Sequence, residues 1–88
     1  MTDDTEPTPI TDANAPAHVI AAAIHDITKQ GLPGHGPEAV RHRLLRPASV
    51  VRAAAAYSRA RKSGKTERGA VRDAAIQLVR HYRVQHRL

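Results

Sequence analysis

Apolar side chains recur every three or four residues in the last quarter of the chain, as on one face of a helix. Val71, Ala74, Ala75, Leu78 and Tyr82 share that face at about 100° per residue. The arginines of the same segment gather in an adjoining arc, which holds Arg68, Arg72, Arg80, Arg83 and Arg87. The pattern predicts a helix over 67–87 with an apolar face toward the protein and a cationic face beside it.

The stretch 15–30 has the same periodicity and clearer end signals. Its apolar stripe repeats at i, i+3, i+4 and i+7, and consists of Ile20, Ala23, Ile24 and Ile27. Asn14 is the predicted N-cap, and Pro16 is tolerated in the first turn. Gly31 suits the left-handed position after a helix, and Pro33 prevents the helix from continuing. A helix over 15–30 follows.

Two prolines divide the next part of the chain. Pro37 opens a predicted helix of about ten residues, with Val40 and Leu44 on its apolar face. Pro47 ends that helix, because the residue before a proline is pushed out of helical geometry. Pro47 also opens a third helix, which is predicted over 47–62. The inner face predicted for this third helix consists of Val50, Ala54 and Tyr57.

A four-residue turn, 63–66, separates the last two helices, with Thr66 as the predicted N-cap. Its letters GKT resemble the end of a phosphate-binding loop. That motif also requires a glycine where Arg59 stands and a strand before the loop, which argues against a nucleotide site. Lys65 and the first-turn amides can still contact a phosphate locally.

The last two helices admit two interpretations. Their order and the turn containing Gly64 fit a helix-turn-helix, whose second helix enters the major groove. In that case Lys65, Thr66, Arg68, Arg72 and Gln77 face the duplex. An antiparallel αα-hairpin explains the same pattern equally well.

The fold class is therefore all-α, a small bundle of four helices whose second helix is short. Residues 1–13 are rich in Thr, Asp and Pro and hold one large apolar side chain, Ile10. Such a segment buries too little surface to offset its ordering entropy, so a disordered acidic tail is expected there. Residues 14–88 form the expected helical domain.

Composition limits the size of the core. Leu, Ile and Val together number 17 of 88 residues, there is no Phe, and 16 residues are alanine. Alanine favours helix but buries little area, so the core is thin and a homodimer is expected. The chain has no cysteine, no signal-peptide pattern and no long apolar run, which favours a cytoplasmic location.

The net charge of +6 is unevenly distributed. Residues 1–40 carry one lysine and six carboxylates, whereas residues 41–88 carry thirteen basic and two acidic side chains. Such segregation is typical of an acidic tail followed by a body that binds a polyanion. Two simpler explanations remain open, namely a need for solubility and a genomic base bias toward arginine and alanine.

Catalytic and metal patterns are weak. The six histidines include no i, i+4 pair on one helix, and the basic half holds only Glu67 and Asp73 as acidic ligands. The serines lack a partnered base, and no carboxylate pair shares a face there. We expect no enzyme activity, no cofactor and no metal site.

The segregated arginines favour a small DNA-binding regulator or accessory factor, dimeric and positioned by phosphate contacts. The candidate nucleic-acid-binding residues are Arg52, Arg59, Lys62, Lys65, Thr66, Arg68, Arg72, Arg80, Arg83 and Arg87. The alternative is a protein-interaction module, antitoxin-like or a phage or plasmid accessory protein, whose helix 67–87 binds an acidic partner. Ile76 inside the arginine arc suits that alternative. Binding to an anionic membrane surface ranks third, since the apolar face lacks Phe and Trp.

Overall fold

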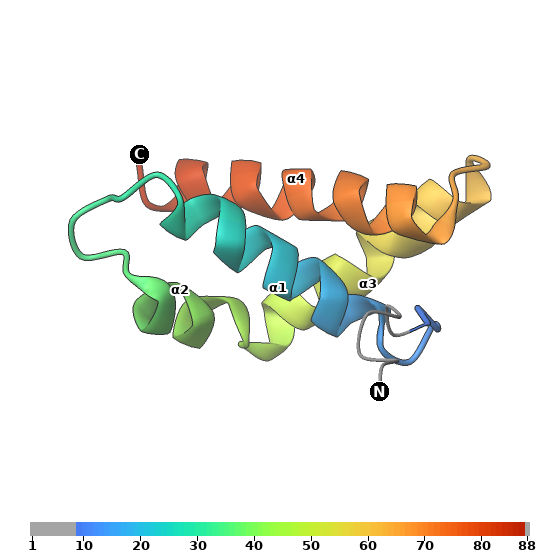
Figure 1. Cartoon of the computed structure of the whole chain (residues 1–88), viewed down its shortest axis with the longest axis horizontal. Helices are drawn as coiled ribbons and strands as arrows, with labels where there is room; N and C mark the ends of the chain where they lie inside the picture. The colour runs from blue at the N-terminus through green and yellow to red at the C-terminus, as the bar shows by residue number, and fades with distance from the viewer. Residues whose placement is uncertain (1–8, 88) are drawn as a thin grey trace, which may run out of the picture.

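The computed structural model describes residues 9–87 and shows four α-helices and, within that range, no strand. The helices are α1 (Ala15–Thr28), α2 (Pro37–Leu44), α3 (Pro47–Lys62) and α4 (Glu67–Gln85). Figure 1 shows α1 crossing in front of the other helices, with α4 along one side and α2 and α3 along the other. The all-α prediction with four helices and a short second one is confirmed.

The predicted end signals operate in most places. Pro37 and Pro47 occupy the first positions of α2 and α3, where the missing N–H costs nothing. Gly31 adopts a φ of 66°, the left-handed conformation expected after α1. The helices end two residues earlier than predicted in each of three cases, at positions 28, 44 and 85.

The start of α1 differs from the prediction. Asn14 makes no side-chain cap bond to α1. Its Oδ1 instead accepts from the backbone N–H of Thr11 (2.7 Å), and its own N–H donates to Thr11 Oγ1 (3.2 Å). This reciprocal pair has the form of a capping box placed one turn earlier. Asn14 therefore holds the predicted N-cap position, but its carboxamide bonds to the preceding turn and does not cap α1.

The predicted tail, 1–13, is only partly described. Residues 1–8 lie outside the described residues. Residues 9–13 have a defined conformation, and Ile10 is half-buried against the core. The one large apolar side chain of this segment thus packs against the helical domain.

The core lies where α1 meets the other helices. α1 packs against α2, α3 and α4, and α4 packs against α1 and α3. Among the described residues, α2 and α4 are not packed against each other. The largest fully buried side chains are Tyr82, Ile27, Leu78, Val19 and Val40, and alanines fill much of the rest.

The inner face of α3 is rotated from its predicted position. Its buried residues are Ala53, Ala56, Tyr57 and Ala60. Tyr57 is buried and Val50 is half-buried against the core, as predicted, whereas Ala54 is exposed, so the predicted face was wrong at Ala54. Small side chains on the true face let α3 lie close to its neighbours.

The turn between α3 and α4 is fixed by backbone hydrogen bonds. Gly64 has a φ of 97°, and its N–H donates to the carbonyl of Arg61 (3.0 Å). The N–H of Lys65 donates to the carbonyl of Ala60 (3.2 Å). These two bonds form a Schellman motif, which stops α3 and reverses the chain. Thr66 then caps α4 as predicted, its Oγ1 accepting from the Gly69 N–H at 3.1 Å.

The two helices run back from this turn in opposite directions (Figure 1). Beyond the turn, Arg59 Nη2 donates to Gln77 Oε1 at 3.5 Å. Still farther along, Arg52 near the start of α3 and His81 near the end of α4 line one cavity. α3 and α4 thus pack against each other beyond the turn and diverge toward their far ends, an arrangement that fits an antiparallel αα-hairpin.

Candidate nucleic-acid interface

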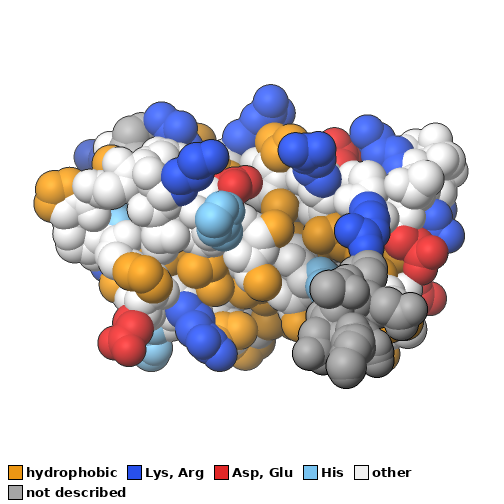
Figure 2. Space-filling model, in the orientation of Figure 1, with side chains coloured by type: hydrophobic (Ala, Val, Ile, Leu, Met, Phe, Trp, Pro, Cys, Tyr) orange, Lys and Arg blue, Asp and Glu red, His pale blue; other side chains and the backbone are white. Residues whose placement is uncertain are grey.

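The exposed side of α4 carries a row of arginines, which we call the α4 ridge and define as Arg72, Ile76, Arg80 and Arg83. All four side chains are exposed, and Ile76 is 42% accessible. Figure 2 shows Lys and Arg side chains gathered along the edge of the molecule over α4. Within the described residues, no carboxylate forms a salt bridge with a ridge arginine. The ridge arginines are therefore not paired with a carboxylate, although Arg72 shares a groove with Asp26.

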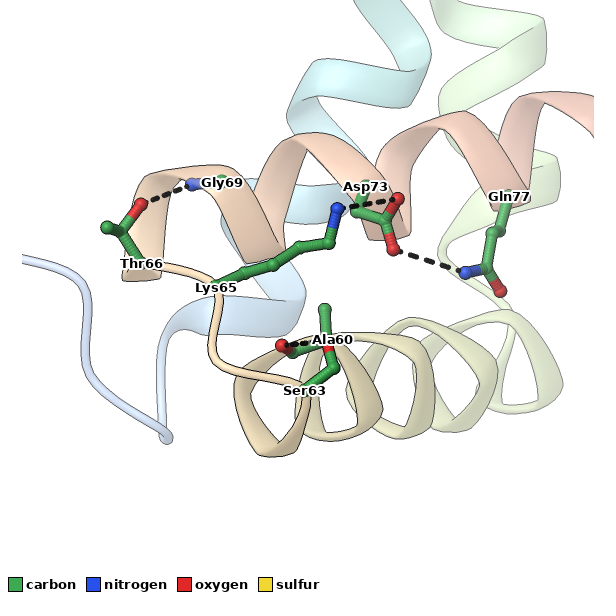
Figure 3. A network of polar contacts seen from close by, with 7 residues as sticks. All are labelled: Ala60, Ser63, Lys65, Thr66, Gly69, Asp73 and Gln77. Carbon is green, nitrogen blue, oxygen red and sulfur yellow. Dashed lines mark hydrogen bonds and ion pairs between the residues drawn. The ribbon is translucent and has the colours of Figure 1, made fainter.

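The predicted contacts near the turn have partners inside the protein (Figure 3). Lys65 Nζ lies 3.7 Å from Asp73 Oδ1, and Gln77 Nε2 donates to Asp73 Oδ2 at 3.5 Å. The hydroxyl of Thr66 is engaged as the cap of α4. Arg59 shares Gln77 with Asp73. These four side chains stabilise the hairpin, and such a surface ion pair contributes about 0–1 kcal/mol.

Two further candidates lie outside the α4 ridge. Arg68 lines the groove between α1 and α4 together with the ridge residue Arg72, and this groove also contains Asp26. Lys62 lines a cavity beside Asp12, on the side of α3 near the start of α1. Arg68 thus adjoins the ridge, whereas Lys62 lies apart from it, and each of the two cations has a carboxylate in the same wall.

The last two candidates lie toward the other end of α4. Arg87 follows the helix with a φ of 54°, a left-handed conformation that is uncommon outside glycine. Arg52 of α3 faces a cavity of about 230 Å³ between the start of α3 and the end of α4. We call this cavity the basic pocket, and its walls consist of Arg43, Arg46, Ala48, Ser49, Arg52, His81, Gln85 and His86.

Arg43 is held beside this pocket by a buried tyrosine. Its Nη1 donates to the Tyr82 hydroxyl (2.9 Å) and to His35 Nδ1 (3.0 Å), and the hydroxyl lies 2.6 Å from that Nδ1. A guanidinium can only donate, whereas the direction of the bond between the Tyr82 hydroxyl and His35 Nδ1 depends on the tautomer of the imidazole. The Tyr82 ring, 1% exposed, thereby has its polar end satisfied. These bonds join α2 to α4.

His86 covers the same group. Its ring lies 4.3 Å from the Tyr82 ring and 5.7 Å from the His35 ring, centroid to centroid. Partial burial, followed by the charges of Arg43, His35 and Arg46, lowers the pKa of His86 below its ordinary value of 6.5. The pKa thus reports a surplus of positive charge around this ring.

Sequence reasoning missed the pocket as a unit. His81 and His86 were not predicted, and Arg43 and Arg46 were counted only among the thirteen basic side chains of the second half, outside the shorter list of candidate residues. In residues 9–87, no group of three or more histidines and carboxylates could hold a metal ion. None of the described helices is long and apolar enough to cross a membrane.

Comparison with known proteins adds no constraint on the assignment of this interface. No protein-family model, curated protein or solved structure matches the chain. The functional argument therefore depends on the side chains themselves and on the charges around them.

Proposed function

We propose that this chain is a small, non-enzymatic DNA-binding protein that contacts duplex phosphates through the α4 ridge. The observation that supports it best is the row of exposed, unpaired arginines on one side of a single helix. From Arg72 to Arg83 the helix rises about 16 Å at ~1.5 Å per residue. Duplex DNA presents one phosphate charge per ~1.7 Å over that length, so several phosphates lie within reach of the ridge.

A duplex suits the surface better than a single strand does. Single-stranded nucleic acid is held largely by bases stacked on exposed aromatic rings. The two tyrosines of the chain, Tyr57 and Tyr82, are 5% and 1% exposed and belong to the core. The ridge offers guanidinium groups, which fork onto phosphate oxygens, and no stacking surface. The proposed role is that of a regulator or accessory factor acting as a homodimer.

The test is a salt-dependent titration of random duplex DNA with the full chain. Replacing Arg72, Arg80 and Arg83 together by alanine removes up to three phosphate contacts. The slope of log affinity against log salt then becomes shallower by up to ~2.7, at ~0.9 per contact. The matched control replaces Lys29, Arg41 and Lys62, which removes the same charge from exposed positions off the ridge. Absence of binding at low salt, or equal losses in both variants, contradicts the proposal.

A specific observation also favours a second candidate, an acidic protein partner bound by α4. Ile76 lies among the ridge arginines, and Val84, 78% exposed, follows two turns later on the same helix. An exposed branched side chain surrounded by arginine is typical of a protein interface. An antitoxin-like role or a phage or plasmid accessory role belongs to this candidate.

The substitution Ile76→Ser separates the two candidates because it leaves every charge in place. DNA affinity should stay within about twofold if phosphates are the ligand, since surface substitutions are usually small in effect. A ridge that binds an acidic protein instead loses affinity for that protein at least ~10-fold, as interface hot spots do.

A further inference from the structure

Four cavities on the described surface have basic residues in their walls, and three of them also contain a carboxylate. Arg41 shares its cavity with Glu38. Arg61 and Lys62 share theirs with Asp12, and Arg68 and Arg72 share theirs with Asp26. The walls of the basic pocket contain three arginines and two histidines and no acidic residue. The basic pocket is thus the one of these four cavities whose walls contain no carboxylate.

The cations of this pocket come from separate elements. Arg43 belongs to α2, Arg46 precedes α3, and Arg52 lies within α3, while His81 and His86 come from the end of α4. Converging like charges destabilise a folded chain unless an anion joins them. A bound anion would convert this repulsion into attraction, which is the usual reason for such an arrangement at a binding site.

Arg43 is already positioned for such a ligand. One of its terminal nitrogens, Nη1, is occupied by Tyr82 and His35, which fixes the guanidinium plane. Within the described residues, its second terminal nitrogen and the side chains of Arg46 and Arg52 form no hydrogen bond with the protein. Several N–H donors therefore remain available around one cavity, and one of the three arginines needs no reordering on binding.

The size and donor set of the pocket match a phosphate group. Its volume of about 230 Å³ is several times the ~30 Å³ that a water molecule occupies in the liquid. The donors approach from α2, α3 and α4, and Ser49 adds a hydroxyl from the first turn of α3. A planar carboxylate has two oxygens on one side, whereas a tetrahedral phosphate presents oxygens in every one of these directions.

We propose that the basic pocket binds a single phosphate group, held by Arg43, Arg46 and Arg52 with His81 and His86. The ligand chemistry is a phosphate monoester or inorganic phosphate, or a backbone phosphate of a nucleic acid. The pocket and the α4 ridge use different arginines, so the phosphate site goes beyond the proposed DNA contact. Occupation by inorganic phosphate requires no duplex.

The experiment follows the ring resonances of His81 and His86 by NMR while inorganic phosphate is added to the full chain. A parallel series uses sodium chloride at the same ionic strength. We expect saturable shifts with phosphate alone. The double variant Arg46→Gln/Arg52→Gln should weaken phosphate at least ~10-fold, since hydrogen bonds to charged groups are the strong ones. Both arginines are exposed, so the variant should fold, which circular dichroism verifies.

The matched control is Arg72→Gln/Arg83→Gln on the ridge, which removes the same charge and should leave phosphate affinity within about twofold. A third series adds random duplex DNA. If DNA shifts the two rings, free phosphate does not, and the pocket variant loses the shifts, the pocket holds a backbone phosphate. The proposal is overturned if phosphate and DNA both shift the histidine resonances without saturation, as sodium chloride does. It is also overturned if the pocket variant binds phosphate as tightly as the wild type.

The two proposals fail separately. If the protein binds inorganic phosphate but no duplex DNA, the DNA function is contradicted and the phosphate site stands. If duplex DNA binds through the α4 ridge and neither phosphate nor DNA shifts the resonances of His81 and His86, the phosphate site is contradicted and the DNA function stands.

Discussion

The two ends of the α3–α4 hairpin use their charged residues in opposite ways. At the closed end, beside the turn, Lys65 pairs with Asp73, and the carboxylate is shared with Gln77. At the open end, Arg46 and Arg52 line a cavity whose walls contain no acidic residue. Charges at the closed end are neutralised within the fold, whereas those at the open end remain available to a ligand.

This difference shows why a count of arginines is a poor guide to a binding surface. Lys65 and Thr66 stood among the predicted contacts, yet their polar atoms are engaged by Asp73 and Gly69. Arg43 was counted among the basic side chains but not in the shorter candidate list, yet it lines a cavity whose walls contain no carboxylate. What a cation can bind depends on which internal acceptors it meets. Changes at the closed end should therefore affect stability, and changes at the open end should affect binding.

The largest effect is expected from enlarging a small side chain at the closed end. Ala60 is buried near the turn, so Ala60→Leu forces extra volume into a packed seam and should destabilise the protein by about 1–3 kcal/mol. Ala48→Leu at the open end, where the side chain is exposed, should cost under ~0.5 kcal/mol. Urea unfolding measures both. If Ala60→Leu and Ala48→Leu lower the free energy of unfolding by similar amounts, the two ends of the hairpin do not differ in packing.

A smaller effect is expected from removing the hydroxyl that joins α2 to α4. Tyr82→Phe should lower the free energy of unfolding by about 1 kcal/mol, because His35 and Arg43 lose a shared buried partner. The control is Tyr57→Phe, whose hydroxyl bonds to no other described residue. Tyr82→Phe should also weaken phosphate binding, since Arg43 loses one of the hydrogen bonds that hold its guanidinium. An effect of Tyr57→Phe as large as that of Tyr82→Phe would show that ring packing matters and the hydroxyl bonds do not.

The smallest effect concerns pH. The pKa of His86 is lowered in the folded protein, so the unfolded chain binds more protons as the pH falls through about 6.5. The free energy of unfolding should therefore decrease over that interval, down to the folded pKa. His86→Gln should reduce this decrease, as measured by thermal unfolding between neutral and acidic pH.

Arg43→Gln tests the cause of this shift, because it removes one of the charges that lower the pKa of His86. The pKa, followed by NMR, should move back toward 6.5, whereas Arg41→Gln on the opposite side of α2 should leave it in place. An unchanged pKa of His86 in the Arg43 variant would mean that the charge of Arg43 does not contribute to the lowering.

Much of the fold was predictable because the sequence marks its own boundaries. Pro37, Pro47 and Thr66 act where the chain geometry requires them, and Gly64 supplies the reversal. The inner face of α3 was not predictable, since alanine occurs on every side of that helix. Where residues differ little in hydrophobicity, the periodic signal vanishes and only the packing of neighbouring helices selects the buried side.

The candidate site was predictable only along a single helix. Exposure of Arg72, Ile76 and Arg80 follows from the 3.6-residue period of α4, whose buried side was correctly assigned. The basic pocket combines residues from three elements that lie far apart in sequence. Nothing in local spacing brings Arg43 near His86, because that juxtaposition depends on how α1 holds the other helices together.

The alanine seam beside the turn has a mechanical consequence. α3 and α4 meet closely there and separate toward their far ends (Figure 1). A larger side chain at Ala60 should push the two helices apart beside the turn. Because Arg52 lies about two helical turns from Ala60, the spacing between Arg52 and His81 should change with it, and the width of the basic pocket then depends on the small size of one alanine.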